Sequence, residues 1–308
     1  MRMQRTFFVT LFISFTCSVF AYSPGTSGFQ FLKMQVGARA AGMGGAFLAV
    51  PGDVNALFYN PAGIAAVAKK SASFSYHNDL LDINSGFIGY VHPGVGPGAI
   101  GASVLYRDYG SFAKTDVTGQ ELGSFSSNYF SLMGSYGLNV LKNLTAGGSL
   151  KYAQGMIDNY SSSAIAVDAG VLYSIPQEQL TLALGFYNVG TTLNAFVDAK
   201  DPLPMQLRLG LAKRLAHLPL LIGFNAYKYN DEPWYFALGG EFTITDNLFL
   251  RLGYDTFGRD LDVDSSKDTL AGAAIGFGFL WKNVAFDYSY SSLGALGALN
   301  RFTLSGQF

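Results

Sequence analysis

Few residues of this sequence have the type and spacing that chemistry requires. The three histidines, His77, His92 and His217, fall near the ends of expected strands or in turns, where a polar rim residue is the ordinary explanation. Residues 260–265 resemble a calcium loop, but Ser265 stands where that loop needs glycine, and its twelfth position is not Glu. No nucleophile elbow, zinc-binding helix motif or phosphate-binding glycine loop is present. The sequence therefore predicts no enzyme, no metal site and no cofactor.

A second set of residues could provide charge inside a structure. Several segments alternate between apolar and polar residues, and their polar positions include the charged residues Lys151, Arg208, Arg251 and Asp287. Two further charged residues, Arg39 and Asp53, precede these segments. On a strand that faces lipid, a charge at mid-depth costs about 2–4 kcal/mol, so these side chains are expected to point into a lumen. They would form ion pairs there, with Arg39 and Asp53 as natural partners. The alternative is an electrostatic lining along a substrate path.

The elements that would position these charges are strands. From Ser71 to Phe308 the hydrophobic period is two: in residues 283–291, Val284, Phe286, Tyr288 and Tyr290 alternate with smaller or polar residues. Short turns between the strands tend to alternate with longer loops, at 108–127, 190–203 and 258–267. The expected strands number about fourteen: 71–77, 83–92, 99–107, 128–138, 143–155, 162–174, 180–189, 204–213, 219–229, 234–243, 248–257, 268–281, 284–292 and 300–308.

The composition and the pattern of an export signal favour a membrane barrel over a soluble sheet protein. The chain of 308 residues is 49% hydrophobic, 15% aromatic and only 13% charged, and its net charge of −1 gives no reason to expect nucleic acid. Residues 1–21 have the pattern of a signal peptide, with Arg2 and Arg5 before an apolar run; cleavage would remove Cys17, the only cysteine. No later segment has the 18 consecutive apolar residues of a spanning helix. A closed barrel is the other structure that satisfies every backbone group in lipid.

The last strand carries a further indication. Residues 301–308 alternate to the end and finish on an aromatic residue. Bacterial outer-membrane barrels commonly end in this way, and the barrel-assembly machinery reads that strand. We therefore interpret Phe302, Leu304 and Phe308 as the assembly signal.

Residues 22–70 precede the strands and show no extended alternation, so we expect a compact segment inside the barrel. Its two motifs, Gly-Ala-Arg-Ala-Ala-Gly-Met-Gly-Gly-Ala-Phe at 37–47 and Ala-Leu-Phe-Tyr-Asn-Pro-Ala-Gly-Ile at 56–64, resemble the N-terminal signature of the PorV/PorQ (UPF0164-like) family. That group is similar to the FadL long-chain fatty-acid transporters. The resemblance implies an all-β, transmembrane antiparallel barrel of about 14 strands, residues 71–308, plugged by an N-terminal hatch. The implied hatch or gate residues are Gly42, Gly44, Gly45, Asn60, Pro61, Ala62 and Gly63.

Two functions follow from this resemblance. The first is a FadL-like channel for passive transport of hydrophobic small molecules, such as long-chain fatty acids, across the outer membrane of a Gram-negative-type bacterium. The second is a PorV-like barrel that serves type IX protein secretion. Expected partners are outer-membrane lipid, a hydrophobic small molecule, the barrel-assembly machinery and, for the second function, secretion-system proteins. An outer-membrane enzyme would need a rim Ser/His/Asp cluster, which the sequence does not show.

Overall fold

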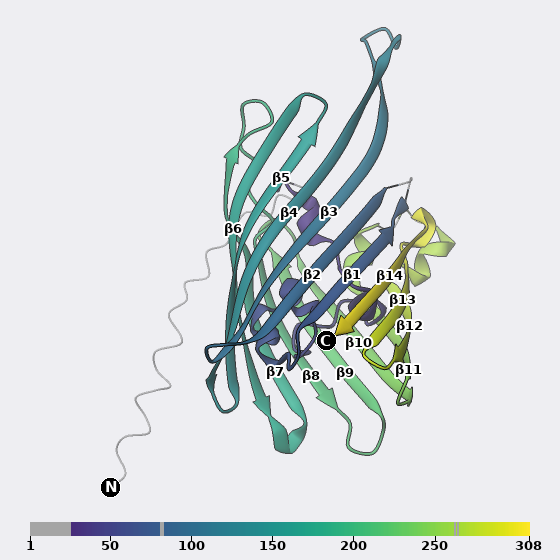
Figure 1. Cartoon of the computed structure of the whole chain (residues 1–308). Helices are drawn as coiled ribbons and strands as arrows, with labels where there is room; N and C mark the ends of the chain where they lie inside the picture. The colour runs from purple at the N-terminus through teal and green to yellow at the C-terminus, as the bar shows by residue number, and fades with distance from the viewer. Residues whose placement is uncertain (1–25, 81–82, 262, 264) are drawn as a thin grey trace, which may run out of the picture.

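The structure, a computed structural model, is an antiparallel barrel of fourteen strands that closes on itself (Figure 1). It describes residues 26–80, 83–261, 263 and 265–308; the expected signal peptide, residues 1–21, lies outside the described residues. The predicted fold class is confirmed. The strands are β1 (Ser71–Asn78), β2 (Asn84–Val95), β3 (Gly98–Thr115), β4 (Glu121–Leu141), β5 (Leu144–Ile157), β6 (Tyr160–Ile175), β7 (Leu180–Asn194), β8 (Gln206–Arg214), β9 (Leu220–Tyr229), β10 (Trp234–Thr245), β11 (Leu248–Asp255), β12 (Ala273–Trp281), β13 (Val284–Ser292) and β14 (Ala298–Gln307).

Each strand pairs with its neighbours in sequence, and β1 pairs with β14 to close the ring. The closing register runs from Ser71 opposite Gln307 to Asn78 opposite Asn300. Closure leaves no row of unpaired backbone groups at a sheet edge, which is the condition for a sheet inside lipid. Short connections follow β2, β4, β6, β8, β10 and β12 at one end of the barrel, here called the turn end; the other end is the loop end. In bacterial barrels the short turns face the periplasm.

One predicted loop is wrong. Residues 108–127 were expected to form a long connection, yet β3 continues to Thr115 and β4 already begins at Glu121. Their extensions pair as a hairpin that projects beyond the other strands (Figure 1), with Phe112 stacked on Phe125 at 5.4 Å between ring centroids. This segment is rich in Gly, Ser and Asp, so the alternation is weak there and gives little sign of a strand.

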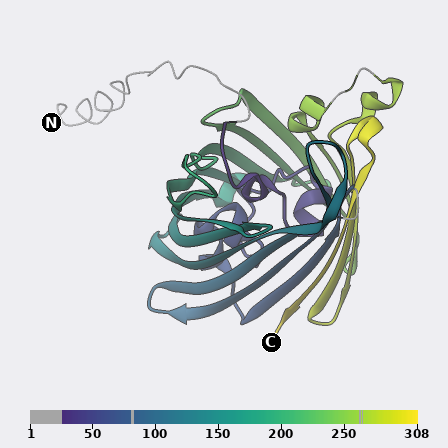
Figure 2. The same ribbon diagram turned by 90° about the horizontal axis from the view of Figure 1, so that it is seen from above.

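The segment before β1 lies inside the barrel (Figures 1 and 2). Its short elements are η1 (Gln30–Lys33), α1 (Ala38–Gly42), α2 (Ala56–Tyr59) and η2 (Pro61–Ala66), and most of their apolar side chains are buried. It enters at the loop end, where the Gly28 N–H donates to the Pro202 carbonyl at 2.9 Å, and leaves at the turn end, where β1 begins. We call residues 26–70 the internal segment. None of the helices in the described part of the chain has the length and apolar run that crossing a membrane requires.

Glycines on the inner face of the wall make room for the internal segment. At Gly276, a side chain would meet the Cα of Gly42 at 3.0 Å, and the same close approach occurs between Gly239 and Met43. A residue with a Cβ at these positions would push the internal segment away from the wall. The inward-facing glycines that contact the internal segment lie on ten strands: Gly89, Gly101, Gly137, Gly147, Gly170, Gly210, Gly223, Gly239, Gly253 and Gly276.

The outer face of the barrel is apolar. On most strands alternate residues expose large hydrophobic side chains, as Leu238 and Leu252 do on β10 and β11, while their neighbours point inward. Aromatic residues stand at both ends of this apolar belt, with Trp234 at the loop end and Trp281 at the turn end. A closed barrel with an apolar belt between two aromatic girdles is a barrel of the bacterial outer membrane.

Candidate functional site

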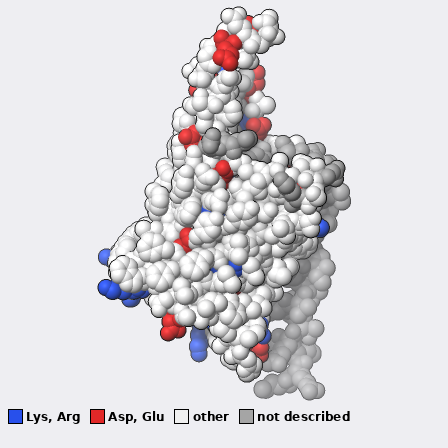
Figure 3. All heavy atoms as spheres, turned by 90° about the vertical axis from the view of Figure 1, so that its right-hand side faces the viewer, with Lys and Arg blue, Asp and Glu red and all other residues white. Residues whose placement is uncertain are grey.

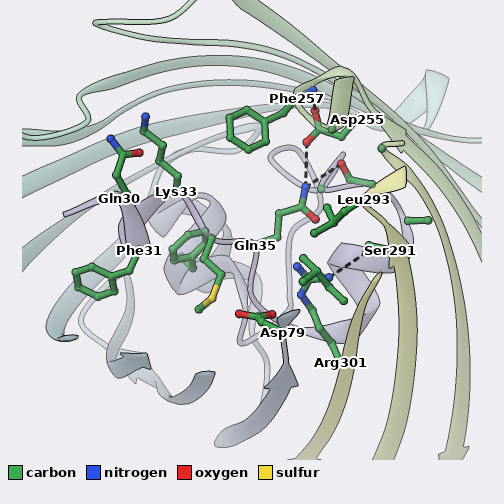
Figure 4. Close-up of a pocket in the computed structure, with 18 of the residues that line it drawn as sticks. Gln30, Phe31, Lys33, Gln35, Asp79, Asp255, Phe257, Ser291, Leu293 and Arg301 are labelled. Atoms are coloured by element: carbon green, nitrogen blue, oxygen red, sulfur yellow. Dashed lines mark hydrogen bonds between the residues drawn. The ribbon is translucent and has the colours of Figure 1, made fainter. Parts of the chain in front are cut away.

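A cavity of about 470 Å³ lies in the loop-end half of the barrel, between the internal segment and the wall (Figure 4). We call it the inner cavity. One side is formed by η1 and the residues after it, including Phe31 and Met34, and the opposite side by the loop-end parts of β11 to β14. Its size lies in the usual range for a small-molecule site.

Most of the lining is apolar or aromatic. Phe58 comes from α2, Tyr227 and Tyr229 from β9, Phe257 from the connection after β11, and Leu293 from the connection after β13. The rings of Tyr227 and Tyr229 meet edge to face at 5.9 Å. An apolar molecule that enters from water would therefore be enclosed mainly by carbon.

Two arginines of the lining lack a carboxylate partner. Among the described residues, no Asp or Glu oxygen lies within 4.0 Å of the guanidinium nitrogens of Arg208 or Arg301. Arg301, only 3% exposed, donates to the Ser291 hydroxyl at 3.0 Å (Figure 4), and its Nε has no partner. Arg208 donates to Gln206 and lies 4.9 Å from the Tyr187 ring centroid. The cavity thus combines apolar walls with two positive charges that can accept an anionic group.

Other charged groups at the inner cavity are already paired. Arg107 lies 3.0 Å from Asp79, and Lys33 lies 2.5 Å from Glu232. Asp255 accepts hydrogen bonds from the Tyr227 hydroxyl at 2.7 Å and from Gln35 at 3.0 Å. The Lys33–Glu232 pair and the Gln35–Asp255 hydrogen bond attach η1 and the residues after it to the wall.

A network of ion pairs lies on the turn-end side of α1. Arg39 binds Glu241 through two hydrogen bonds of 2.7 Å and Asp53 at 2.9 Å. Arg251 joins the same Glu241 at 2.7 Å and Asp287 at 2.6 Å. The network connects the internal segment to β10, β11 and β13. Of the predicted lumen charges, Arg39, Arg251 and Asp287 therefore lie together here.

The other two predicted lumen charges lie elsewhere in the interior. Lys151 of β5 pairs with Asp168 at 2.7 Å and donates to Asn188 at 2.8 Å, which stabilises an irregular step between β6 and β7. Arg208 lies in the inner cavity, as described above. Both side chains are buried inside the barrel.

The predicted hatch glycines lie where the internal segment touches the wall. A Cβ on Gly42 would lie 2.9 Å from the Cα of Gly276, and one on Gly44 2.6 Å from the backbone nitrogen of Tyr254. Gly45 has φ of 78°, a left-handed conformation that favours glycine.

The second predicted hatch motif consists of Asn60, the N-cap of η2, and the first three residues of η2. The Asn60 side chain accepts from Ala62 N–H at 3.1 Å and donates to the carbonyls of Leu48, at 3.2 Å, and Val171, at 3.3 Å. Pro61 is the first residue of η2, where its missing N–H costs nothing. At Gly63 a side chain would contact Ala56, and so this turn is tightly packed against α2 and against β6.

One histidine differs from expectation. His77 was predicted to be a polar rim residue, and this is wrong: it is fully buried on the inner face of β1, opposite Arg301, and neither ring nitrogen has a hydrogen-bond partner. It faces inward because it shares the phase of Ser73 and Ser75. His217 is exposed in the turn after β8. Among the described residues, no group of three or more His, Cys, Asp or Glu is placed to hold a metal ion.

A smaller pocket of about 320 Å³ lies outside η1. It is lined by Phe29, Tyr109, Tyr129 and Phe196, and Gln30 contacts both this pocket and the inner cavity. Tyr129 lies 5.6 Å from the Tyr109 ring centroid and 6.3 Å from that of Phe196. We call it the outer aromatic pocket. Residues 28–34 therefore separate two aromatic spaces.

Sequence reasoning missed Arg301 and the tyrosines of β9 as cavity residues. Arg301 stands on the inward phase of β14, so the alternation that located Arg208 and Arg251 could also have located it. Tyr227 and Tyr229 are inward aromatic residues on a strand whose outward residues are mostly apolar, so the alternation there does not identify the face that points into the lumen.

Comparison with known proteins supports the fold. No protein-family profile and no curated protein sequence matches the chain. Among solved structures, a FadL homologue from Pseudomonas aeruginosa is similar, with a TM-score of 0.58 and 14% identity over 89% of this chain and 98% of that one. The toluene transporter TodX of Pseudomonas putida has a TM-score of 0.57 and 12% identity over 88% and 96%. The monoaromatic hydrocarbon channel CymD has a TM-score of 0.59 and 12% identity over 89% and 97%. The chain has the fold of the FadL-type outer-membrane barrels.

Proposed function

We propose that the chain is a passive outer-membrane channel for small hydrophobic molecules, with long-chain fatty acids as its substrates. The observation that carries the proposal is the inner cavity, whose apolar walls contain the unpaired cations Arg208 and Arg301. An apolar tail gains free energy by leaving water, and a carboxylate would compensate these charges. The likeness in fold to channels for hydrophobic compounds agrees with this assignment.

The proposed route begins at the outer aromatic pocket and continues past η1 into the inner cavity. From there the internal segment closes the way to the turn end, so it would serve as the hatch. Its Gly42–Gly45 region, the turn Asn60–Gly63 and the Arg39 ion pairs hold that closed position. Release of the ligand requires displacement of at least part of the segment.

The test uses cells whose lipopolysaccharide-containing outer membrane is itself a barrier. A Gram-negative host without its own long-chain fatty-acid channel should take up labelled oleate when it expresses this chain. The variant Asn55→Cys/Ser73→Cys tests the hatch, because these side chains meet at 3.4 Å and join the internal segment to β1. Once thiol counting shows that the bond has formed, oxidised cells should lose uptake and reduced cells should regain it. No uptake of oleate or toluene above cells with empty vector would contradict the proposal.

The alternative, a PorV-like role in type IX secretion, rests on the motifs at residues 37–47 and 56–64. Membership of the PorV/PorQ family remains a prediction from the same residues. The inner cavity is an observation that favours transport, because a docking platform has no need of an enclosed apolar space with two unpaired cations.

A further inference from the structure

The two ends of the barrel carry opposite charge. At the turn end, the exposed or half-exposed basic residues of the strand ends and connections are Lys69, Lys70, Lys142, Lys213, Arg214 and Lys282, and the exposed acidic residues there are Glu178 and Asp246. Among the described residues, the connections of the loop end contain nine acidic residues, Asp79, Asp116, Asp158, Asp198, Asp201, Asp231, Glu232, Asp260 and Asp268, and three basic ones, Lys200, Arg259 and Lys267. Figure 3 shows one face with red atoms on the projecting hairpin and both blue and red atoms toward the lower end.

The basic residues of the turn end are spread around the barrel. Lys282 lies between β12 and β13, Lys69 and Lys70 precede β1, Lys142 lies between β4 and β5, and Lys213 and Arg214 end β8. In the order of strands around the barrel these positions fall in four separate sectors. We call the six residues the basic ring. A single protein partner would contact one side of the barrel, whereas a lipid leaflet surrounds it.

The basic ring lies at the depth of an aromatic girdle. Lys282 follows Trp281, and its Nζ is 5.4 Å from the centroid of that ring. The Phe308 N–H donates to the Lys70 carbonyl at 2.9 Å, so Lys70 stands beside a second exposed aromatic residue. Aromatic girdles mark the level of lipid headgroups, and a Lys side chain next to one extends its ammonium group into that layer.

Most of the ring's charge is uncompensated within the described chain. The ion pair found there joins Lys213 to Glu178 at 3.3 Å, and both side chains are largely exposed. Since exposed pairs of this kind contribute little, the ring retains a positive potential at the headgroup level. We propose that the basic ring binds anionic phospholipid headgroups, such as phosphatidylglycerol, in the leaflet at the turn end. This inference is independent of what the channel transports.

The two tryptophans allow a direct test in lipid vesicles, because Trp234 reports on the loop end and Trp281 on the turn end. The full chain with Trp234→Phe keeps Trp281 alone, and the chain with Trp281→Phe keeps Trp234. The quenchers are brominated phosphatidylglycerol and, at equal content, brominated phosphatidylcholine, each diluted in neutral phosphatidylcholine. The first should quench the fluorescence of Trp281 at least about twofold more than the second, because each cation near an anionic surface contributes roughly a fivefold preference for anionic lipid. Trp234 should show no such excess.

A matched pair of triple variants gives the control. The first variant removes three cations of the basic ring, by Lys69→Gln/Lys142→Gln/Lys282→Gln in the Trp234→Phe background. It should lose most of the additional quenching by brominated phosphatidylglycerol. Salt at 1 M should have the same effect, because it screens exposed charges beyond roughly 3 Å. Lys114→Gln/Lys200→Gln/Lys228→Gln, the same charge change away from the turn end, should leave the excess unchanged. Equal quenching of Trp281 by the two brominated lipids would overturn the proposal and leave an acidic soluble partner as the alternative. Oleate uptake enters none of these measurements, so the two proposals fail separately.

Discussion

Among the described residues, Arg208 and Arg301 are in direct contact with an aromatic ring, an amide and a hydroxyl group, and not with a carboxylate. A buried cation without a counterion costs several kcal/mol, and an anion that enters the cavity reduces this cost. Specificity for acids over neutral hydrocarbons would therefore reside in these two side chains. The alternation of the sequence located Arg208 on an inward face, but its partners came from β7, β9 and the internal segment, which alternation does not bring together.

Replacement of Arg301 by Gln should separate binding of the acid from binding of the tail. Loss of a charged hydrogen-bond donor costs about 1.5–3 kcal/mol, so oleate should bind roughly 10- to 100-fold more weakly. A neutral hydrocarbon of similar length should bind as before. Titration of purified protein in detergent by fluorescent-ligand displacement measures both. Arg259→Gln, a change at an exposed loop-end arginine, is the control and should alter neither affinity. Equal weakening for the neutral ligand would mean that Arg301 only shapes the cavity.

Asp231 fixes the start of the internal segment at the loop end. Burial opposes its charge, but the hydrogen bonds from Ser27 and the nearby charge of Lys33 outweigh this, so the pKa of the Asp231 carboxyl lies below its usual value. The attachment is therefore fully present above the ordinary Asp pKa of about 3.9 and is lost as the pH falls through the lower pKa of the folded state.

Hydrogen exchange of residues 26–34 can follow this attachment. After correction for intrinsic rates, protection of the Gly28 N–H, which donates to Pro202, should decrease as the pH falls below about 3.9. In Asp231→Asn the protection should be weak at every pH and should no longer depend on it. Unchanged protection down to pH 2 in the native chain would show that the hydrophobic contacts of Phe29 and Phe31 suffice.

At the scale of elements, the fourteen strands could be predicted because each has an apolar face toward lipid. The internal segment could be delimited for the opposite reason, since residues 22–70 lack alternation. The projecting hairpin was missed because β3 and β4 leave the lipid there and lose the pattern that marks a strand. The pair Arg39–Glu241 joins residues 202 apart in sequence, and nothing local in either residue's neighbourhood identifies the other.

The glycines on the inner wall predict the effect of a single added side chain. Gly276→Val places methyl groups against the Gly42 backbone, so the internal segment must move or the wall must yield. We expect a loss of about 1–3 kcal/mol in stability and a higher permeability of vesicles to small sugars. Thermal unfolding and liposome swelling measure these effects. Gly134→Val is the control, because a Cβ there meets nothing within 4 Å, and it should leave both unchanged.

At the scale of the whole molecule, the apolar belt and the projecting hairpin differ in what surrounds them. Leu238 of β10 and Leu122 of β4 have similar exposed fractions, 56% and 61%. The first lies midway along a strand of the belt and the second on the hairpin beyond it. Exposure alone therefore does not distinguish lipid from water, but the position along the barrel does.

Substitution by arginine should reveal this difference. Leu238→Arg should destabilise the barrel in lipid by about 2–4 kcal/mol, the cost of a cation at mid-depth on the lipid face. Leu122→Arg should change stability by less than about 0.5 kcal/mol, as an ordinary surface substitution does. Reversible denaturant unfolding in phospholipid vesicles gives both values. A small effect of Leu238→Arg would place that surface in water.

The fit between the inner-wall glycines and the internal segment has a consequence for biogenesis. The internal segment is synthesised before the strands that enclose it, and β1 follows it directly, so we expect the seam between β1 and β14 to close around a segment that is already in position. If the barrel closed first, some forty residues of the internal segment would have to enter through its open end. They would then have to reach positions in close backbone contact with the inner-wall glycines. We therefore expect the internal segment to serve as the core around which the strands of the barrel assemble.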